Sequence, residues 1–329
     1  MVKLTDVARL ANVSIATVSR TLNGHSTVDK ELADRVRAAA AELGYRPNVV
    51  ARNLRRRGTR VWALVLTDIT NPFYTALARG VEEFASANGY AVLLGNADED
   101  SAKERRHLSA ALEEQVAGII LASRYATTDL STVLAAGTPV VAVNQQLDAT
   151  VDSVVADSDG GARRATEHLL DHGRTHIICI SGPADAETAT TRAAAYRRAM
   201  TDRGLSADVR HTSYDTAGGL AAARELLDDG TPVDAIFAAN AAIALGVIET
   251  LQERRITLGR DVALVCFDDP PWSRIVDPPL TVVAQQPYDL GTEAAKLLLG
   301  RIRGEGPSSP VSVQLSTSLV VRQSCGCPR

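Results

Sequence analysis

Cysteine and aromatic residues are scarce in this chain of 329 residues, which has four cysteines and only 4% aromatic residues. Four cysteines spread over this length do not form a disulfide framework. The N-terminal residues have no apolar core of a signal peptide, and no apolar run is long enough to span a bilayer. These absences argue against a disulfide-stapled secreted domain and against a membrane protein, and we expect a cytoplasmic location.

Motifs for nucleotide cofactors and for catalytic zinc are also missing. The chain contains neither G-x-G-x-x-G nor G-x-x-x-x-G-K-[ST], and it has no H-E-x-x-H. His168 and His172 are four residues apart and could share a helix face, but we interpret them as surface residues. Cys325 and Cys327 could bind a metal, but two thiols without a partner pair are poor evidence, and we expect a disordered tail there. The sequence therefore predicts no cofactor, no metal site and no catalytic residue.

Charge is distributed unevenly along the chain. The net charge is −4, but the first 60 residues carry +7 and the remainder carries −11. A basic module attached to an acidic body indicates that one end of the chain meets a polyanion.

The basic module has the spacing of a helix-turn-helix unit. Thr5 is a good N-cap for a first helix, and Asn12 tolerates the left-handed conformation of a tight turn. Ser14 can cap a second helix over residues 15–22, and Asp29 can cap a third.

The second helix has residues suited to reading DNA from a major groove. Ile15 and Ala16 can press on thymine methyl groups, Thr17 can bond a phosphate, and Arg20 can reach guanine. The motif alone favours the alternative of a small helical hairpin that packs on the main body, because short helical pairs are common.

A basic segment follows the three helices. Asn48 can cap a short helix that continues to Leu54, and four of residues 52–57 are arginine. A charge run of this kind is usually a solvated linker. The alternative is a hinge helix that orders on DNA, where the arginines neutralise phosphates and Leu54 wedges into a minor-groove step.

Beyond residue 60, apolar Val/Ile/Leu runs alternate with helical patterns, which indicates parallel strands buried on both faces. Ligands of such sheets bind beyond the carboxyl ends of the strands, where polar and aromatic side chains could grip a polyhydroxylated molecule. Each such residue could equally be a loop cap, and Asp98, Asp157 and Trp272 are weaker candidates. The effector-binding residues that we predict are Phe73, Tyr74, Asn144, Thr188, Arg192, Tyr214, Asn240 and Asp268.

An ordered series of motifs resembles the LacI/GalR family of transcription regulators over essentially the whole chain. It begins with LTDVARLANVSIATVSRTLNG and AAELGYRPNVVARNLRRRG, continues through NPFY, IICISGP and AIFAAN, and ends with FDDPPWSRIVDPPLTVVAQQPYDLG and STSLVVRQS. Together with the predicted helices, the resemblance implies twelve residues that contact DNA. They are Thr5, Ser14, Ile15, Ala16, Thr17, Ser19, Arg20, Asn23, Asn48, Ala51, Leu54 and Arg55.

The fold implied by the resemblance is α/β, with a three-helix head at 1–46, a hinge helix and linker at 47–59, and a body at 60–329. The body is expected to be a periplasmic-binding-protein-like pair of doubly wound parallel sheets, with chain crossovers near residues 156, 285 and 316. Lobe 1 would then hold about 60–156 and 285–315, and lobe 2 about 157–284 and 316–329.

The expected function is that of a repressor that binds palindromic, double-stranded operator DNA as a homodimer. A small metabolite would control it allosterically, a sugar or related polyol first and a nucleoside second. Two alternatives remain at this point: a solute-binding protein without a DNA role, and an enzyme that acts on a sugar. No nucleophile–base pair supports the enzyme.

Overall fold

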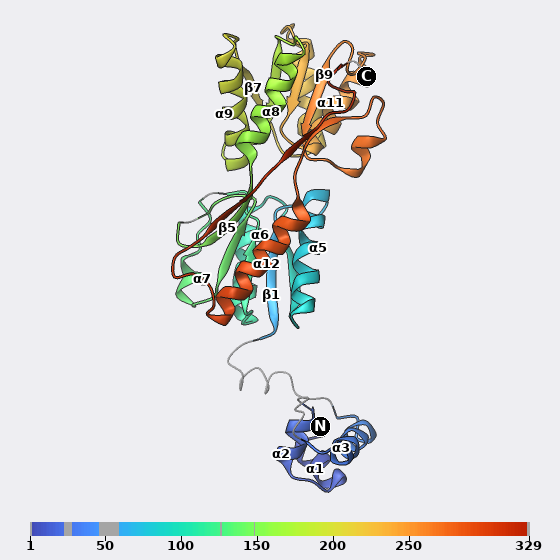
Figure 1. Cartoon of the computed structure of the whole chain (residues 1–329), viewed down its shortest axis with the longest axis vertical. Coiled ribbons are helices and arrows are strands. Elements are labelled where there is room, and N and C mark those ends of the chain that lie inside the picture. The colour runs from blue at the N-terminus through green and yellow to red at the C-terminus, as the bar shows by residue number, and fades with distance from the viewer. Residues whose placement is uncertain (1, 23–27, 46–58, 126, 148, 328–329) are drawn as a thin grey trace. The chain divides into compact units, whose positions relative to one another are not determined.

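The structure is a computed structural model that describes residues 2–22, 28–45, 59–125, 127–147 and 149–327 (Figure 1). The chain forms two compact units, residues 1–59 and residues 60–329. Within the described ranges, no helix combines the length and the apolar content that crossing a membrane requires.

The first unit contains three short helices packed on a small apolar core. Val7, Val18 and Val36 are fully buried, one from each helix, and alanines fill the space between them. The helices are α1 (Leu4–Ala11), α2 (Ile15–Leu22) and α3 (Lys30–Glu42).

The predicted turn and two of the predicted caps are confirmed in this unit. Asn12 adopts the left-handed conformation (φ 52°, ψ 52°) between α1 and α2. The Ser14 hydroxyl accepts the Thr17 N–H at 3.1 Å, and the Asp29 carboxylate accepts two backbone N–H groups at the start of α3. These bonds satisfy N–H groups that have no partner within their own helices.

The predicted cap of the first helix is wrong by two residues. The N-cap of α1 is Lys3, whose backbone N–H donates to the Asp6 carboxylate at 2.9 Å. This contact lets the helix begin at Leu4, so Thr5 lies inside the first turn with its side chain exposed. Five residues predicted to contact DNA, and the predicted hinge helix, lie outside the described residues: Asn23, Asn48, Ala51, Leu54 and Arg55.

Lobe 1 of the second unit is built on a six-stranded sheet with the order β11-β5-β4-β3-β1-β2, in which every pairing is parallel. Its strands are β1 (Val61–Leu66), β2 (Ala91–Asn96), β3 (Gly118–Leu121), β4 (Val140–Val143), β5 (Asp152–Ala156) and β11 (Ser312–Leu315). Its helices are α5 (Pro72–Ala87), α6 (Ser101–Glu113), α7 (Ser131–Ala135) and α12 (Pro287–Arg303).

Lobe 2 repeats the design with the order β12-β10-β9-β8-β6-β7, where only the β10–β12 pairing is antiparallel. Its strands are β6 (Ile177–Ser181), β7 (Asp208–His211), β8 (Ala235–Ala238), β9 (Ala263–Phe267), β10 (Thr281–Ala284) and β12 (Ser318–Val320). Its helices are α8 (Ser158–Asp171), α9 (Glu187–Asp202), α10 (Thr216–Asp228), α11 (Ala241–Glu253) and the 3₁₀ helix η1 (Pro271–Arg274).

The central strands of each sheet are buried on both faces, as the continuous apolar runs predict, whereas the edge strands β2, β7, β11 and β12 are partly exposed. Along β1, Trp62, Leu64 and Leu66 pack into one core of lobe 1, whereas Ala63 and Val65 pack into the other. Successive side chains of a strand point to opposite faces, so a strand covered on both sides has no position for a polar residue. The central strands β1, β3, β4, β8 and β9 accordingly contain no polar residue, and polar residues follow where these strands end.

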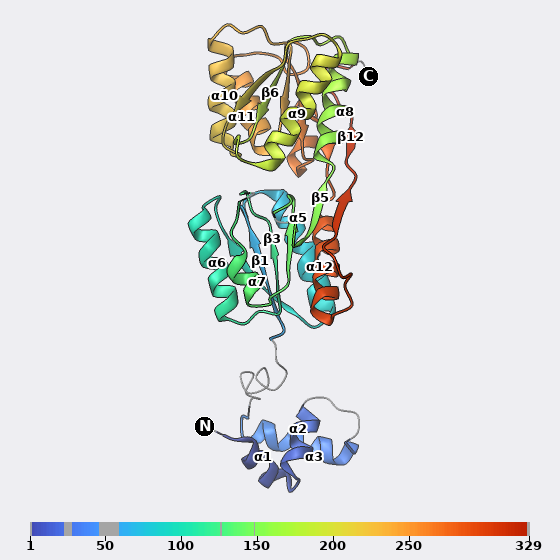
Figure 2. The same cartoon turned by 90° about the vertical axis from the view of Figure 1, so that its left-hand side faces the viewer.

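The chain passes between the lobes three times. It leaves the first sheet after β5, returns after β10, and crosses again between β11 and β12. Figure 2 shows the two lobes joined by these strand-like connections on one side of the body. The carboxyl ends of the parallel strands in both lobes meet at the boundary between the lobes.

The segment after β12 is folded, and the expectation of a disordered tail at Cys325 and Cys327 is wrong. Cys325 is fully buried in an apolar core of lobe 2. The Ser324 hydroxyl donates to the Leu264 carbonyl at 2.6 Å, and the Leu264 N–H donates to the Ser324 carbonyl at 2.8 Å. The segment thereby continues the hydrogen bonding of the sheet beyond its last regular strand.

Candidate functional site

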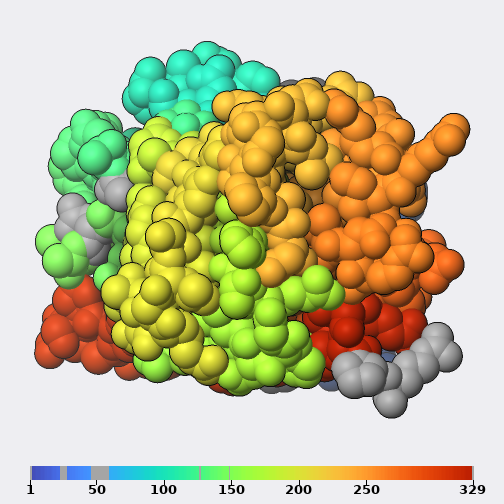
Figure 3. Space-filling view, turned by 90° about the horizontal axis from the view of Figure 1, so that it is seen from above, coloured from blue at the N-terminus to red at the C-terminus, as the bar shows by residue number. Residues whose placement is uncertain are grey.

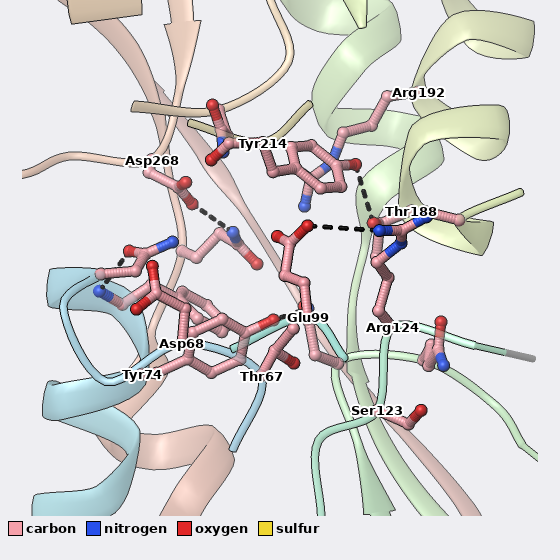
Figure 4. A pocket seen from close by; sticks show the side chains of 17 residues that line it. Thr67, Asp68, Tyr74, Glu99, Ser123, Arg124, Thr188, Arg192, Tyr214 and Asp268 are labelled. Carbon is pink, nitrogen blue, oxygen red and sulfur yellow. Dashed lines mark hydrogen bonds and ion pairs between the residues drawn. The ribbon is translucent and has the colours of Figure 1, made fainter. Parts of the chain in front are cut away.

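A cavity lies between the two lobes at the carboxyl ends of their strands (Figure 4). Its empty space is about 580 Å³, part of which is open to solvent. The structure brings all eight predicted effector-binding residues together in its lining, although they are up to 195 positions apart: Phe73, Tyr74, Asn144, Thr188, Arg192, Tyr214, Asn240 and Asp268. Their contact with a ligand stays a prediction.

The three weaker candidates do not line this cavity. Asp98 pairs with Lys103, Asp157 caps α8, and Trp272 packs against the core of lobe 2. Each therefore has the structural role that such residues most often have.

Two of the predicted lining residues have backbone conformations that are uncommon for residues with side chains, and so does Glu99, which also lines the cavity (φ 55°). Asn144 follows β4 with φ 73°, and Asp268 follows β9 with φ 83°. Left-handed conformations outside glycine are sparsely populated and often occur at functional sites. Asn144 and Asp268 each lie where a strand ends and the following loop begins to line the cavity.

Arg192 and Asp268 are the charged residues among those predicted for the cavity. The Arg192 guanidinium is only 4% exposed, stacks on the Phe267 ring at 3.7 Å, and donates to the Ala239 carbonyl at 2.7 Å. The Asp268 carboxylate accepts a hydrogen bond from the Gln285 amide. Burial raises the pKa of Asp268, while the positive charge of Arg192 opposes that rise. A carboxylate and a guanidinium held in this way can together orient several ligand hydroxyl groups.

Aromatic rings and hydroxyl groups form the walls. Phe73 and Tyr74 pack edge to face with 5.1 Å between ring centroids, and the Asn144 amide donates to the Tyr74 hydroxyl at 3.3 Å. Burial raises the pKa of Tyr74 to about 12, so its hydroxyl stays protonated at neutral pH. On the other lobe, the Thr188 and Tyr214 hydroxyls share a hydrogen bond of 2.9 Å.

Asn240 has a structural role within lobe 2. Its side-chain oxygen accepts the Ile243 N–H at 2.7 Å and thereby caps α11, and its amide donates to the Tyr214 carbonyl at 3.2 Å. Asn240 thus fixes the Tyr214 loop at the edge of the cavity. It is the predicted residue whose polar groups are most fully used by the protein.

Sequence reasoning missed nine other lining residues, which are Thr67, Asp68, Asn71, Glu99, Ser123, Arg124, Gln145, Ala186 and Gln285. Three of them carry buried polar atoms with no hydrogen-bond partner among the described residues: Arg124 Nε, Gln145 Nε2 and Gln285 Oε1. Buried polar groups are normally paired, so these unpaired atoms are unusual features of the lining residues. The strand-end rule could have found Gln145, which directly follows Asn144, but not Gln285, because no strand was predicted before it.

One of the missed residues also joins the lobes. The Arg124 guanidinium of lobe 1 lies 3.4 Å from the Glu99 carboxylate and 3.0 Å from both carboxylate oxygens of Asp185 in lobe 2. Burial raises the pKa of Glu99, which lies partly enclosed beside this pair. The Arg124–Asp185 pair joins the two lobes and would have to break if the lobes separated.

The candidate DNA-reading residues lie on the surface of the helical unit. Thr5, Ser14, Ile15, Ala16 and Arg20 are exposed, whereas Thr17 and Ser19 are half-buried. Ile15 is 49% exposed although a folded unit of this size needs its apolar residues for the core. An exposed isoleucine next to hydroxyl groups and an arginine is suited to thymine methyl groups and base edges.

A helix-turn-helix unit joined to a two-lobed body with a polar cavity defines a class of protein: DNA-binding regulators that respond to a small molecule. Comparison with protein families makes the assignment definite. Residues 3–48 match the model of the bacterial regulatory proteins of the lacI family, and residues 166–325 match a periplasmic binding protein-like domain. The chain belongs to the lacI family of bacterial regulatory proteins, which confirms the resemblance seen in the sequence.

Individual relatives match over nearly the whole chain. A ribose operon repressor of Bacillus subtilis (strain 168) is 36% identical over 325 residues, which cover 98% of each chain. The structure of a transcriptional regulator CelR–cellobiose complex is 33% identical, covers 98% of this chain and 100% of that one, and superposes with a TM-score of 0.75. The lac repressor dimer bound to operator and the anti-inducer ONPF is 26% identical, with coverage of 98% and 99% and a TM-score of 0.89.

Proposed function

We propose that this chain is a repressor that binds a palindromic operator as a homodimer and is controlled by a sugar bound between its lobes. The observation that carries the proposal is the convergence of Arg192, Asp268, Gln145 and Gln285 on one cavity, where Gln145 Nε2 and Gln285 Oε1 have no hydrogen-bond partner among the described residues. These groups offer donors and acceptors to many hydroxyl groups, while Phe73 offers an apolar face.

The relatives support a sugar over a nucleoside. One relative is a ribose operon repressor, and one related structure contains cellobiose. Both sugars named there are polyhydroxylated, which suits a cavity lined by a carboxylate, a guanidinium and amides. We propose no catalytic activity, and incubation with the same sugars is expected to leave them unchanged.

Dimerisation follows from the way a helix-turn-helix reads DNA, since one recognition helix covers only a half-site. The body offers apolar surface for such an interface: Leu93 and Leu94 on the edge strand β2 are each 43% exposed, and Leu245 on α11 is 38% exposed. We propose that residues 47–59 form the hinge and that a ligand acts by favouring one lobe arrangement, which changes how the two hinges approach.

The test starts from DNA. The purified chain would select duplexes from a random library, and fluorescence anisotropy would compare the selected palindrome with a scrambled duplex at moderate salt. D-ribose, cellobiose and adenosine would then be titrated into the complex. We expect a preference for the palindrome and a response to a sugar. Equal affinity for both duplexes, with and without these molecules, would refute the proposed function.

A further inference from the structure

A second cluster of ligand atoms lies in lobe 2, away from the cavity between the lobes. His168 is on α8, whereas Cys325 and Cys327 follow β12. The Cys327 sulfur lies 3.3 Å from His168 Nε2 and 2.7 Å from the Cys325 sulfur, and the three ligand atoms all lie within 4.8 Å of one another. The tertiary structure thus supplies the partner that the two thiols lack in the sequence.

The turn that carries the two cysteines is held in place by the surrounding protein. Gly326 has φ 76°, and a Cβ there would lie 2.3 Å from the Gly259 carbonyl oxygen, so only glycine fits between the cysteines. Just before the turn, the Ser324 hydroxyl accepts the Thr281 N–H at 2.8 Å. The turn is therefore ordered before any ligand binds, which lowers the entropic cost of assembling a site.

A second histidine lies beside the cluster. The His172 ring centroid is 4.4 Å from that of His168, and its Nδ1 donates to the His168 carbonyl at 2.7 Å. This spacing of four residues puts both imidazoles on one face of α8. A tetrahedral ion held by three ligands keeps a fourth position, and His172 or a water molecule could fill it.

We propose that His168, Cys325 and Cys327 bind a thiophilic metal ion, with zinc as the expected species. Two thiolates and an imidazole are the donors that zinc prefers in proteins, and hard ions such as magnesium prefer oxygen. Binding displaces the thiol protons, so the affinity rises with pH. This site is independent of the proposed effector, because none of its residues lines the cavity.

The two sulfurs are separated by a distance between those that a disulfide and a metal site require. All four cysteines are free, and 2.7 Å exceeds the ~2.05 Å of a sulfur–sulfur bond. Tetrahedral zinc with Zn–S distances near 2.3 Å needs its sulfurs ~3.7 Å apart. Metal binding would therefore require the half-buried Cys327 side chain to rotate outward, because Cys325 is enclosed.

The metal would join two segments that both begin at crossovers between the lobes. Helix α8 starts directly after the first crossover, and β12 starts directly after the third. At that end, Arg164 of α8 donates to the Thr317 carbonyl at 2.9 Å. In Figure 3 the red C-terminal segment lies beside the light green of the chain around α8, on the side of lobe 2 that faces the viewer. A bound ion would link α8 to the segment after β12 a second time, at the end of α8 away from the crossover, and would raise the unfolding temperature.

The test uses the full chain, reduced and freed of metal, and titrates it with Co²⁺ and then Zn²⁺. We expect one equivalent of Co²⁺ to give thiolate-to-cobalt charge-transfer bands and the intense visible bands of tetrahedral cobalt, and Zn²⁺ to displace it. Cys325→Ser, Cys327→Ser and His168→Ala should each weaken binding by at least about 100-fold, the upper end of what losing a ligand's outer partner costs. Cys179→Ala, on β6 and outside the cluster, is the matched control and should bind normally.

Maleimide labelling gives a second readout that does not depend on how stable the variants are. In the unsubstituted chain, Zn²⁺ should slow labelling of Cys327 and raise the unfolding temperature. The proposal is overturned if the reduced chain binds Co²⁺ no more tightly than the Cys325→Ser/Cys327→Ser variant. It is equally overturned if Zn²⁺ leaves labelling unchanged, or if air converts the pair to a disulfide and the reduced form takes up no metal.

Discussion

Two neighbouring aspartates at the end of β9 should respond in opposite ways to replacement by asparagine. Burial raises the pKa of Asp268, whereas Asp269 has its pKa lowered by hydrogen bonds from Arg322 and Ser273. The Arg322 guanidinium lies 2.7 Å from the Asp269 carboxylate, and both side chains are 14% exposed. The fold therefore penalises the charge of one aspartate and stabilises the charge of the other.

For Asp268→Asn, two changes of opposite direction are expected. The folded state disfavours the ionised carboxylate, so its removal should raise the unfolding temperature at neutral pH. The ligand, in contrast, loses a hydrogen bond to a charged group, which contributes about 1.5–3 kcal/mol. The dissociation constant for the sugar that responds should therefore rise by roughly 10–150-fold, while the affinity of the sugar-free protein for its operator stays the same.

The dependence on pH adds an independent check. Because the folded-state pKa of Asp268 is raised, its unfavourable effect on stability appears as pH rises through the usual aspartate range to this pKa. The stability advantage of Asp268→Asn should consequently shrink as pH falls through that window. Sugar binding to the unsubstituted chain should also weaken there, because the carboxylate becomes protonated.

Isothermal titration calorimetry of the sugar and thermal unfolding between pH 4 and pH 8 would measure both effects. Asp269→Asn is the matched control: it should lower stability and leave sugar affinity within about twofold. If Asp268→Asn lowers the unfolding temperature and binds sugar normally, Asp268 is a structural residue and the reasoning fails.

Three further results are expected from other parts of the chain. Arg20→Ala should weaken the binding free energy for the operator by about 1–3 kcal/mol and relax specificity near one base pair. An equal loss of affinity for operator and random duplexes in anisotropy titrations would show that Arg20 contacts only a phosphate. Gly291→Ala should destabilise lobe 1 by about 1–3 kcal/mol in urea unfolding. The reason is that the alanine Cβ would lie 2.2 Å from the Leu77 carbonyl oxygen, where α5 and α12 cross. Unchanged stability would show that the two helices can move apart at no cost. The Asp269–Arg322 pair stabilises the fold above the usual aspartate pKa, and this effect is lost as pH falls through the lowered pKa of Asp269. The Asp269→Asn variant should therefore be less stable at neutral pH. Its stability should also depend less steeply on pH during acid unfolding than that of the unsubstituted chain.

Local rules explain the success of the sequence reading in the helical unit. Asn12, Ser14 and Asp29 act on backbone groups two to four positions away, so their roles can be read without knowing the rest of the fold. Thr5 shows the limit of the same rule. Both Lys3 and Thr5 could have begun the helix, and the hydrogen bond from the Lys3 N–H to the Asp6 carboxylate favours Lys3.

The carboxyl ends of the strands also allowed cavity residues to be predicted from the sequence. Parallel strands buried on both faces force polar residues to their carboxyl ends, and these ends meet at one edge. Asn144 and Asp268 could be selected on that ground alone. Glu99 and Arg124 could not, because they lie in loops whose path depends on how the lobes close over each other.

The sequence by itself determined the helical caps, the alternation of strands and helices, and the residues able to face a ligand. These features depend on interactions between near neighbours and on the burial of each strand. Only the tertiary structure decided which distant side chains meet. It left Gln145 and Gln285 with unpaired polar atoms in the cavity, and it placed His168 against two cysteines more than 150 positions away. Such meetings depend on how sheets and helices pack, and no local pattern of residues encodes that packing.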